Sequence, residues 1–472
     1  MGQTEKLGKN LLLISLGSIG SKALTFLLVP LYTAVLSTEE YGISEVLITT
    51  VSLLMPVFTM TISESMLRFP LDNKNDFNQI FTSGVLVNTV GFLALLAFSP
   101  IILFIDILKP YYGLFILYYF GSSVFNSLSC FTSGRGHVSL STIVGIFQTL
   151  FLVISNILFL LILHWGLEGY LISFIISYLL SSLMLFIFDK QYCLLLKPSK
   201  IDLRLTKDML WYSIPMIPNS ISWWISNSSD KYLLTYFSGP EINGLYSVAY
   251  KVPTLLMVLY GIFMSAWRLS ATDDFGSHES TRFYNAIYKI MTVVLSVFAG
   301  LIILFNYQLS KVFYSNDFFE ARFFVPILVI AVMFHGIAEY YGSIYTSSKQ
   351  TKMLFYSSFA GAVVNIILNL IFIPIWNAYG AAIATLVSYL VILIFRALHS
   401  KKIMYINSND KVFIFTILLL FLMVTIQTLE INNSFVISTC IFILILLINR
   451  SILIKILEKF KTTINSKLYG HK

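Results

Sequence analysis

The stretch VPLYTAVLSTEEYGISEVLITTVSLLMPVFTMTISESMLRF, residues 29–69, has a related copy later in the chain. The copy is DKYLLTYFSGPEINGLYSVAYKVPTLLMVLYGIFMSAWRLS, residues 230–270. In this alignment Gly42 answers Gly244 and Arg68 answers Arg268, so the offset stays between 200 and 202 residues. The chain therefore contains two versions of one apolar helix pair with an acidic loop between its helices.

A second match follows the first in the same order. WGLEGYLISFIISY (165–178) aligns with WNAYGAAIATLVSY (376–389) at an offset of 211 residues. Two ordered matches with nearly the same offset favour an internal repeat over chance similarity between apolar segments. The two matches enclose six predicted spans in each half. Because six is an even number, both halves cross the membrane in the same orientation. Parallel repeats of this kind are a transporter architecture, with the substrate site between the halves.

Composition places the whole chain in a membrane. Of 472 residues, 57% are hydrophobic and 11% are charged, with a mean hydropathy of +0.82, whereas soluble domains carry about 25% charged residues. The apolar runs are continuous and long enough for helices to cross a bilayer. About fourteen spans are predicted: 11–36, 42–66, 80–106, 111–134, 139–164, 168–188, 209–237, 242–267, 285–309, 322–347, 353–375, 378–398, 412–429 and 434–454.

The 31 Lys and Arg residues are distributed unevenly along this span pattern. With a cytoplasmic N-terminus, 24 of them fall on the inner side and three on the outer side. This asymmetry predicts that both termini are cytoplasmic, and it accounts for the net charge of +8 without a nucleic-acid partner. Four basic residues remain within or beside spans: Lys22, Lys231, Lys251 and Lys289.

The repeat also predicts the domain organisation, an all-α polytopic fold of two six-helix lobes plus two C-terminal helices. We expect an N-terminal lobe at 1–188, a cytoplasmic linker at 189–208, a second lobe at 209–400, and two additional helices with a cytoplasmic tail at 401–472. Pro215 and Pro218 predict a kinked or broken helix early in the seventh span. The three cysteines, Cys130, Cys193 and Cys440, lack CxxC spacing and predict neither a disulfide framework nor a metal site.

These features resemble a known family. A first span ending VPLYTAVLS, then TEEYG, a second span ending SMLRF, and late helices such as YGAAIATLVSY are similar to Wzx-type polysaccharide flippases, within the superfamily that includes MATE exporters and the lipid II flippase. The resemblance covers essentially the whole chain. It implies two lobes in a MATE-like fold around a central cavity. It also implies alternating-access transport of an undecaprenyl-diphosphate-linked oligosaccharide across a bacterial plasma membrane. Polysaccharide polymerase and assembly proteins are the implied partners.

Basic residues in the spans are the candidate substrate-binding groups, because a diphosphate stripped of water needs cationic donors. Lys22 is the strongest, since it lies deep in the first span and its own helix offers no acid. Structural alternatives stay open for the others: Lys231 could pair with the adjacent Asp230 or snorkel, and Arg68 could anchor a helix end or pair with Glu64 at i−4. The candidates are Lys22, Lys231, Lys251, Arg68 and Arg268.

Titratable groups in the spans are candidates for ion coupling. His335 and Glu339 are four residues apart and share a helix face, which suits a proton relay or a polar patch satisfied within the lobe. Glu64 and Asp230 are the other acids considered near the membrane. No organic cofactor is expected, and either H⁺ or Na⁺ could drive transport.

Two rival functions remain open. A cation-coupled multidrug exporter of the MATE type would place carboxylates in its cavity, whereas the first span here has Lys22 and no acid between Lys9 and Glu39. A cationic wall repels a cationic drug and attracts a diphosphate. A lipid II-type flippase shares the diphosphate chemistry. An enzyme is disfavoured because the outer loops are short and Walker A, HExxH and GxSxG motifs are absent from the sequence.

Overall fold

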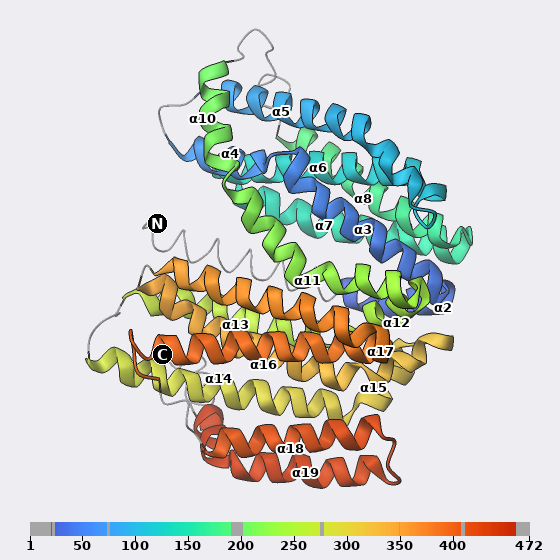
Figure 1. The fold of residues 1–472 in the computed structure, drawn as a ribbon. Coiled ribbons are helices and arrows are strands. Elements are labelled where there is room, and N and C mark those ends of the chain that lie inside the picture. Colours follow the sequence, from blue (N-terminus) through green and yellow to red (C-terminus); the bar gives the residue numbers. More distant parts are fainter. Residues whose placement is uncertain are drawn as a thin grey trace, which may run out of the picture. The chain divides into compact units, whose positions relative to one another are not determined.

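The structure is a computed structural model that describes residues 20, 24–72, 76–189, 202–273, 278–348, 350–406 and 411–458. Helices are the regular secondary structure of these residues, and no strand occurs among them. The chain forms two compact units, with the division between Gly244 and Leu245. Figure 1 shows the helices of both units.

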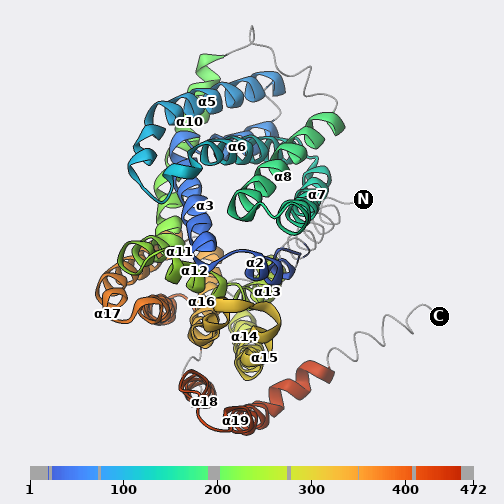
Figure 2. The ribbon, with the colours of Figure 1, turned by 90° about the vertical axis from the view of Figure 1, so that its right-hand side faces the viewer.

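Unit 1 is a bundle of apolar helices. Figure 2 shows α6, α7 and α8 lying side by side, and these three helices contact one another directly. The helices are α2 (Val29–Val35), α3 (Thr38–Phe58), α4 (Ile62–Arg68), α5 (Phe77–Phe98), α6 (Tyr112–Gly134), α7 (Val138–Asn156), α8 (Gly166–Phe188), α10 (Leu203–Ser213), α11 (Met216–Ser238) and the start of α12 (Pro240–Ala249). The chain is broken between α10 and α11 at Pro215, as the two prolines of this segment predict.

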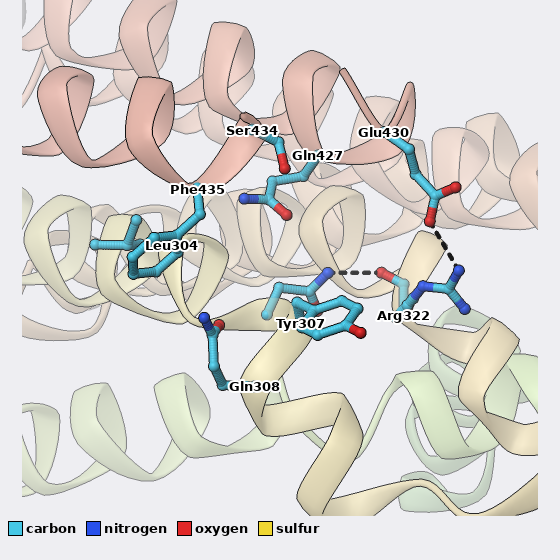
Figure 3. Close-up of a pocket in the computed structure, with 9 residues that line it drawn as sticks. Leu304, Tyr307, Gln308, Arg322, Gln427, Glu430, Ser434 and Phe435 are labelled. Atoms are coloured by element: carbon cyan, nitrogen blue, oxygen red, sulfur yellow. Dashed lines mark hydrogen bonds and ion pairs between the residues drawn. The ribbon is translucent and has the colours of Figure 1, made fainter. Parts of the chain in front are cut away.

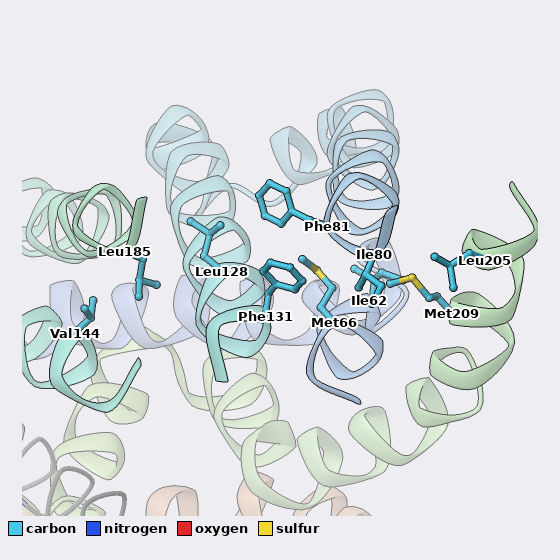
Figure 4. Close-up of a cluster of buried hydrophobic side chains, with 10 residues drawn as sticks. All are labelled: Ile62, Met66, Ile80, Phe81, Leu128, Phe131, Val144, Leu185, Leu205 and Met209. Carbon is cyan, nitrogen blue, oxygen red and sulfur yellow. The ribbon is translucent and has the colours of Figure 1, made fainter. Parts of the chain in front are cut away.

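A buried cluster holds one end of unit 1 together (Figure 4). It joins side chains of α4, α5, α6, α7, α8 and α10, including Met66, Phe131 and Met209. Polar bonds add to this packing, because Ser65 Oγ donates to the carbonyl oxygen of Met209 at 2.6 Å. The helix α10, which begins within the predicted linker, is therefore part of the core of unit 1.

Unit 2 is built around α16 (Val325–Ser347), which is buried along most of its length. It packs against α17, α13 and α14, and α14 also carries α18 and α19, as Figure 1 shows. The other helices are α13 (Thr254–Asp273), α14 (His278–Leu304), α15 (Asn306–Phe313), η6 (Asn316–Phe323), α17 (Thr351–Ser400), α18 (Lys411–Thr428) and α19 (Ser434–Ile448).

Nine helices of the described residues are long and apolar enough to cross a membrane, or up to eleven if each bent pair forms one span. The segment α17 contains two predicted spans, which meet at a backbone break at Asn377 (φ 50°, ψ −128°). Residues 11–19 and 21–23 of the predicted first span lie outside the described residues. The polytopic all-helical fold class is confirmed, whereas the division into lobes at 188 and 209 stays a prediction.

Candidate functional site

An ion pair between α3 and α11 forms the centre of the candidate site in unit 1. The Lys231 ammonium Nζ lies 2.6 Å from Glu45 Oε2, and the two side chains are 18% and 6% exposed. Asp230 is also buried, and its Oδ1 accepts a hydrogen bond from the backbone N–H of Lys231 at 2.9 Å. One ammonium and two carboxyl groups thus meet in a unit made mostly of apolar helices.

The start of α3 fixes the position of Glu45. Ser37 and Glu40 form a reciprocal capping box, in which each side chain accepts a hydrogen bond from the backbone N–H of the other. Glu45 follows one helical turn after Tyr41 and therefore shares its face of α3. The capped helix end places the carboxylate two turns inside the unit.

Three tyrosines lie close to Glu45. Tyr41 makes a side-chain hydrogen bond to Glu45. The rings of Tyr32, Tyr41 and Tyr170 contact one another, with Tyr32 and Tyr170 edge to face at 4.8 Å. All three are at most 2% exposed. Phenol hydroxyls are suitable neighbours for a buried carboxylate because they donate hydrogen bonds without adding charge.

Further polar contacts join α3 to α11 along the same face. The indole N–H of Trp224 donates to the carbonyl oxygen of Thr49 at 2.8 Å, and Tyr232 shares a hydrogen bond with Thr50. Trp224 is thereby placed in helix packing, whereas Trp223 is 47% exposed. The interface between the two helices therefore has polar contacts at two levels of α11, at Trp224 and about two turns later at Lys231 and Tyr232.

The helices of the repeat meet at two small residues. A Cβ atom on Gly42 would lie 1.8 Å from the carbonyl oxygen of Pro240, and one on Gly244 would lie 1.9 Å from that of Thr38. Asn243 Nδ2 donates to the carbonyl oxygen of Gly42 at 3.0 Å. Gly42 and Gly244 are the equivalent residues of the sequence repeat, so the contact is reciprocal. Only glycine permits this approach of α3 and α12.

Burial makes the Glu45–Lys231 pair strongly interdependent. Removing one partner of a buried ion pair leaves an uncompensated charge, which typically destabilises a protein by about 3–5 kcal/mol. Chemically, the ammonium can bind an anion and the carboxylate can take up a proton. An anionic ligand can therefore replace Glu45 at the Lys231 ammonium if Glu45 takes up a proton, and neither buried side chain is then left with an unpaired charge.

In unit 2, Lys251 lies at a helix break. It falls between α12 and α13, whose axes differ by 45°. Its side chain is partly buried, and its carbonyl oxygen accepts a hydrogen bond from the Thr254 hydroxyl. The predicted binding role of Lys251 stays a prediction.

The predicted titratable pair of α16 has two different sets of partners. Glu339 Oε1 lies 3.0 Å from Arg396 Nη1, and Arg396 also donates to Ser357, Ser358 and the carbonyl oxygen of Ala338. His335 Nδ1 is 2.9 Å from the hydroxyl of Tyr260. Arg396 is 2% exposed, so it forms a buried hub between α16 and α17.

The remaining predicted residues lie at surfaces or outside the described residues. Arg68 pairs with Asp72 at 2.8 Å, and this hydrogen bond and the carboxylate charge raise the pKa of Arg68. Glu64 is exposed. Lys22 lies outside the described residues, and so does the side chain of Arg268. Of the predicted set, Lys231 and Asp230 therefore lie at one site in unit 1, whereas His335 and Glu339, on one helix of unit 2, have separate partners.

Two residues of these sites are absent from the sequence prediction. Glu45 could have been found as an acid four residues inside the second predicted span. Arg396 lies two residues before the end of its predicted span, where a basic residue is typical of a cytoplasmic anchor. The roles of Glu45 and Arg396 become clear only when their partners, Lys231 and Glu339, are known from the structure.

Comparison with known proteins supplies the family. A profile described as "Polysaccharide biosynthesis protein" matches residues 7–268, more than half of the chain and including the helices that carry Glu45 and Lys231. The chain belongs to the polysaccharide biosynthesis protein family. This confirms the resemblance to Wzx-type flippases. An uncharacterized membrane protein of Methanocaldococcus jannaschii is 25% identical to this family member over 430 residues, which cover 84% of this chain and 98% of the relative.

Solved transporters share the fold. The lipid II flippase MurJ in an inward closed conformation matches with a TM-score of 0.71 at 17% identity, covering 94% of this chain and 99% of that one. An inward-facing multidrug resistance MATE transporter of the MOP superfamily matches with a TM-score of 0.61 at 13% identity, covering 83% and 95%. Family and fold together place the protein among the multi-pass membrane flippases and transporters of this superfamily.

Proposed function

We propose that the protein translocates an undecaprenyl-diphosphate-linked oligosaccharide from the cytoplasmic to the outer leaflet by alternating access, for assembly of a surface polysaccharide. The observation that carries this proposal is the ammonium group of Lys231, held in an apolar helical unit by Glu45. The family match supports a polysaccharide pathway, and a diphosphate is the part of such a substrate that an ammonium group recognises.

Lys231 binds the substrate by exchanging its partner. In the free protein Glu45 neutralises the ammonium. The diphosphate competes for the same group, and Lys231 then donates its hydrogen bonds to phosphate oxygens. Because both partners are anionic, the ammonium stays paired throughout. Lys251, and Lys22 in the first span, are further candidate donors to the diphosphate.

Glu45 couples this exchange to protons. When phosphate displaces the carboxylate from Lys231, Glu45 loses its counter-ion in a buried position, and a buried carboxylate without a counter-ion favours the protonated form. The proton enters at Glu45 as the substrate binds and leaves when Lys231 returns. Proton and substrate therefore move in the same direction, so a gradient with more protons on the cytoplasmic side favours export and the opposite gradient opposes it. Na⁺ coupling is the alternative that the assay below separates.

The proposed location is the bacterial plasma membrane, with both termini in the cytoplasm. The Lys and Arg distribution supports this orientation. Flipping then delivers the glycan to the outer leaflet, where a polysaccharide polymerase would use it.

A cation-coupled multidrug exporter is the second candidate function. The observation that favours it is the pair of buried carboxyl groups, Glu45 and Asp230, beside a single ammonium. Carboxylates attract organic cations once they are free of their own counter-ion. The two functions make opposite predictions for the removal of Lys231, because a cationic drug gains from its loss and a diphosphate does not.

The test is a flipping assay in proteoliposomes with a defined undecaprenyl-diphosphate oligosaccharide, under H⁺ or Na⁺ gradients. We expect Lys231→Gln to lower the initial rate by at least about tenfold, since charged hydrogen bonds contribute about 1.5–3 kcal/mol. Lys207→Gln is the matched control, because Lys207 is exposed on α10. Wild-type flipping by Lys231→Gln at equal protein level would remove Lys231 from the mechanism.

A further inference from the structure

A pocket of about 280 Å³ with a mixed polar and apolar lining lies in unit 2, away from every residue assigned above. It is formed where α14 ends and α15 begins, and α18 and α19 close its other side (Figure 3). The sequence pattern predicts that this end of the helices faces the outside of the cell, because the segment 310–321 is a predicted outer loop. The proposed transport reaction does not use the pocket.

The pocket is neutral in charge. Its two ionisable lining residues, Arg322 and Glu430, pair with each other at 2.8 Å. The Arg322 guanidinium also lies over the rings of Phe319 and Phe323, at 4.1 Å from each centroid. Both the charge and the flat faces of Arg322 are therefore already engaged, so the pocket does not favour an anion.

Uncharged hydrogen-bonding groups line the rest. The side chains of Gln308, Gln427 and Ser434 border the space, as Figure 3 shows. Asn306 is 4% exposed, and its Nδ2 donates to the carbonyl oxygen of Arg322 at 2.9 Å. The buried Oδ1 of Asn306 has no hydrogen-bond partner among the described residues. A buried amide oxygen requires a donor, and a ligand hydroxyl group is a neutral donor.

Two aromatic rings and Leu304 complete the lining. Tyr307 is 51% exposed, and it packs edge to face on Phe319 with 5.7 Å between ring centroids, which restricts its orientation. Phe435 is 43% exposed on the opposite helix. The face of an aromatic ring is apolar while the tyrosine hydroxyl remains polar. A sugar ring has the same two properties, with apolar C–H faces and hydroxyl groups at its edge.

We propose that this pocket binds one ring of an uncharged saccharide. Its volume is close to the lower limit of small-molecule sites, roughly 300 Å³, which suits a single ring. The Asn306 Oδ1 atom accepts from one sugar hydroxyl, Gln308 and Ser434 exchange hydrogen bonds with others, and the Tyr307 ring packs against a C–H face. The inference goes beyond the proposed function, because it assigns a second, saccharide-selective site that does not depend on Lys231.

Saturation-transfer NMR on the full-length protein in nanodiscs tests this site directly, with no sugar-based detergent present. The probes are the methyl glycosides of glucose, galactose, mannose and N-acetylglucosamine, with methyl phosphate, whose methyl protons are observable, as the anion arm. We expect saturation transfer to at least one glycoside and none to methyl phosphate. Gln308→Ala should lower the affinity for that glycoside by about tenfold, which is the effect of losing one or two hydrogen bonds.

Two variants and a control decide the outcome. Tyr307→Leu should also weaken binding, and Gln350→Ala, at an exposed residue outside the pocket, should leave it unchanged. Absence of transfer to all four glycosides, or equal binding by wild type and Gln308→Ala, would overturn the proposal. Flipping activity is measured separately, so a flippase that fails this test contradicts the pocket and leaves the transport function intact.

Discussion

At the scale of single residues, the molecule is organised by charges that the fold has brought together from distant parts of the chain. Glu45 and Lys231 are 186 residues apart in sequence, and Glu339 and Arg396 are 57 apart. Each pair joins two helices inside one unit. Ionisable groups within membrane segments are rare and mark functional positions, so these pairs are the places where a substitution should have the largest effect.

Glu45→Gln should destabilise the protein by about 3–5 kcal/mol, because it leaves the Lys231 ammonium without its counter-ion. Thermal unfolding in detergent measures this. The double variant Glu45→Gln/Lys231→Met should recover most of the loss, since it removes both charges. Glu39→Gln, at an exposed residue one turn before Gly42, serves as the control. Equal stability of Glu45→Gln and Glu39→Gln would mean that the pair is not buried in the membrane.

Arg396→Lys should behave as a loss-of-structure variant. The guanidinium donates to Ser357, Ser358, Ala338 and Glu339, and a single ammonium group does not span those four acceptors. We expect destabilisation of about 2–4 kcal/mol, read from the unfolding temperature. Arg450→Lys, at an exposed residue of the C-terminal helices, is the matched control. An unchanged unfolding temperature for Arg396→Lys would contradict the claim that the Arg396 guanidinium stabilises the contact between α16 and α17.

At the scale of elements, close contacts and breaks define how the helices are arranged. Gly42 and Gly244 let α3 and α12 approach until each backbone touches the other. Pro215 separates α10 from α11, and Asn377 divides α17 into the two spans expected from the sequence. The repeat is therefore visible both as an alignment and as a reciprocal contact.

Gly42→Ala should destabilise unit 1, because the new Cβ would lie 1.8 Å from a backbone carbonyl oxygen and the helices would have to separate. Overpacking of this kind costs about 1–3 kcal/mol. Gly145→Ala is the control, since nothing lies within 4 Å of its Cβ and alanine favours the helix by about 0.5–1 kcal/mol. The unfolding temperature should fall for the first variant and hold or rise for the second. The reverse order would show that α3 and α12 do not meet as described.

At the scale of the whole molecule, the sequence predicts more of the fold than of the site. Span lengths and the repeat follow from hydropathy and alignment, so the polytopic helical class and its family were predictable. The partner of Lys231 was not predictable from the sequence, because pairing across 186 residues depends on which faces of α3 and α11 meet. Arg68 shows a second limit, since Glu64 and Asp72 both lie four residues away and only the structure selects Asp72.

Orientation is a property of the whole chain that cysteine labelling measures. Asp317 lies in η6 on the predicted outer side, and Lys207 lies in α10 on the predicted inner side; both are exposed. In cells, in a variant without the native cysteines, a membrane-impermeant maleimide should label Asp317→Cys and spare Lys207→Cys. The opposite pattern would invert the topology and place the saccharide pocket inside the cell.

The central claim is that the wild-type protein moves an anionic lipid-linked glycan and not an organic cation. The most direct measurement is transport by one proteoliposome preparation of two probes, a fluorescent undecaprenyl-diphosphate oligosaccharide and ethidium, under a pH gradient. We predict flipping of the lipid-linked oligosaccharide well above that of protein-free liposomes, and ethidium movement at the protein-free level. Ethidium transport without flipping of the lipid-linked oligosaccharide would contradict the account and establish the exporter function instead.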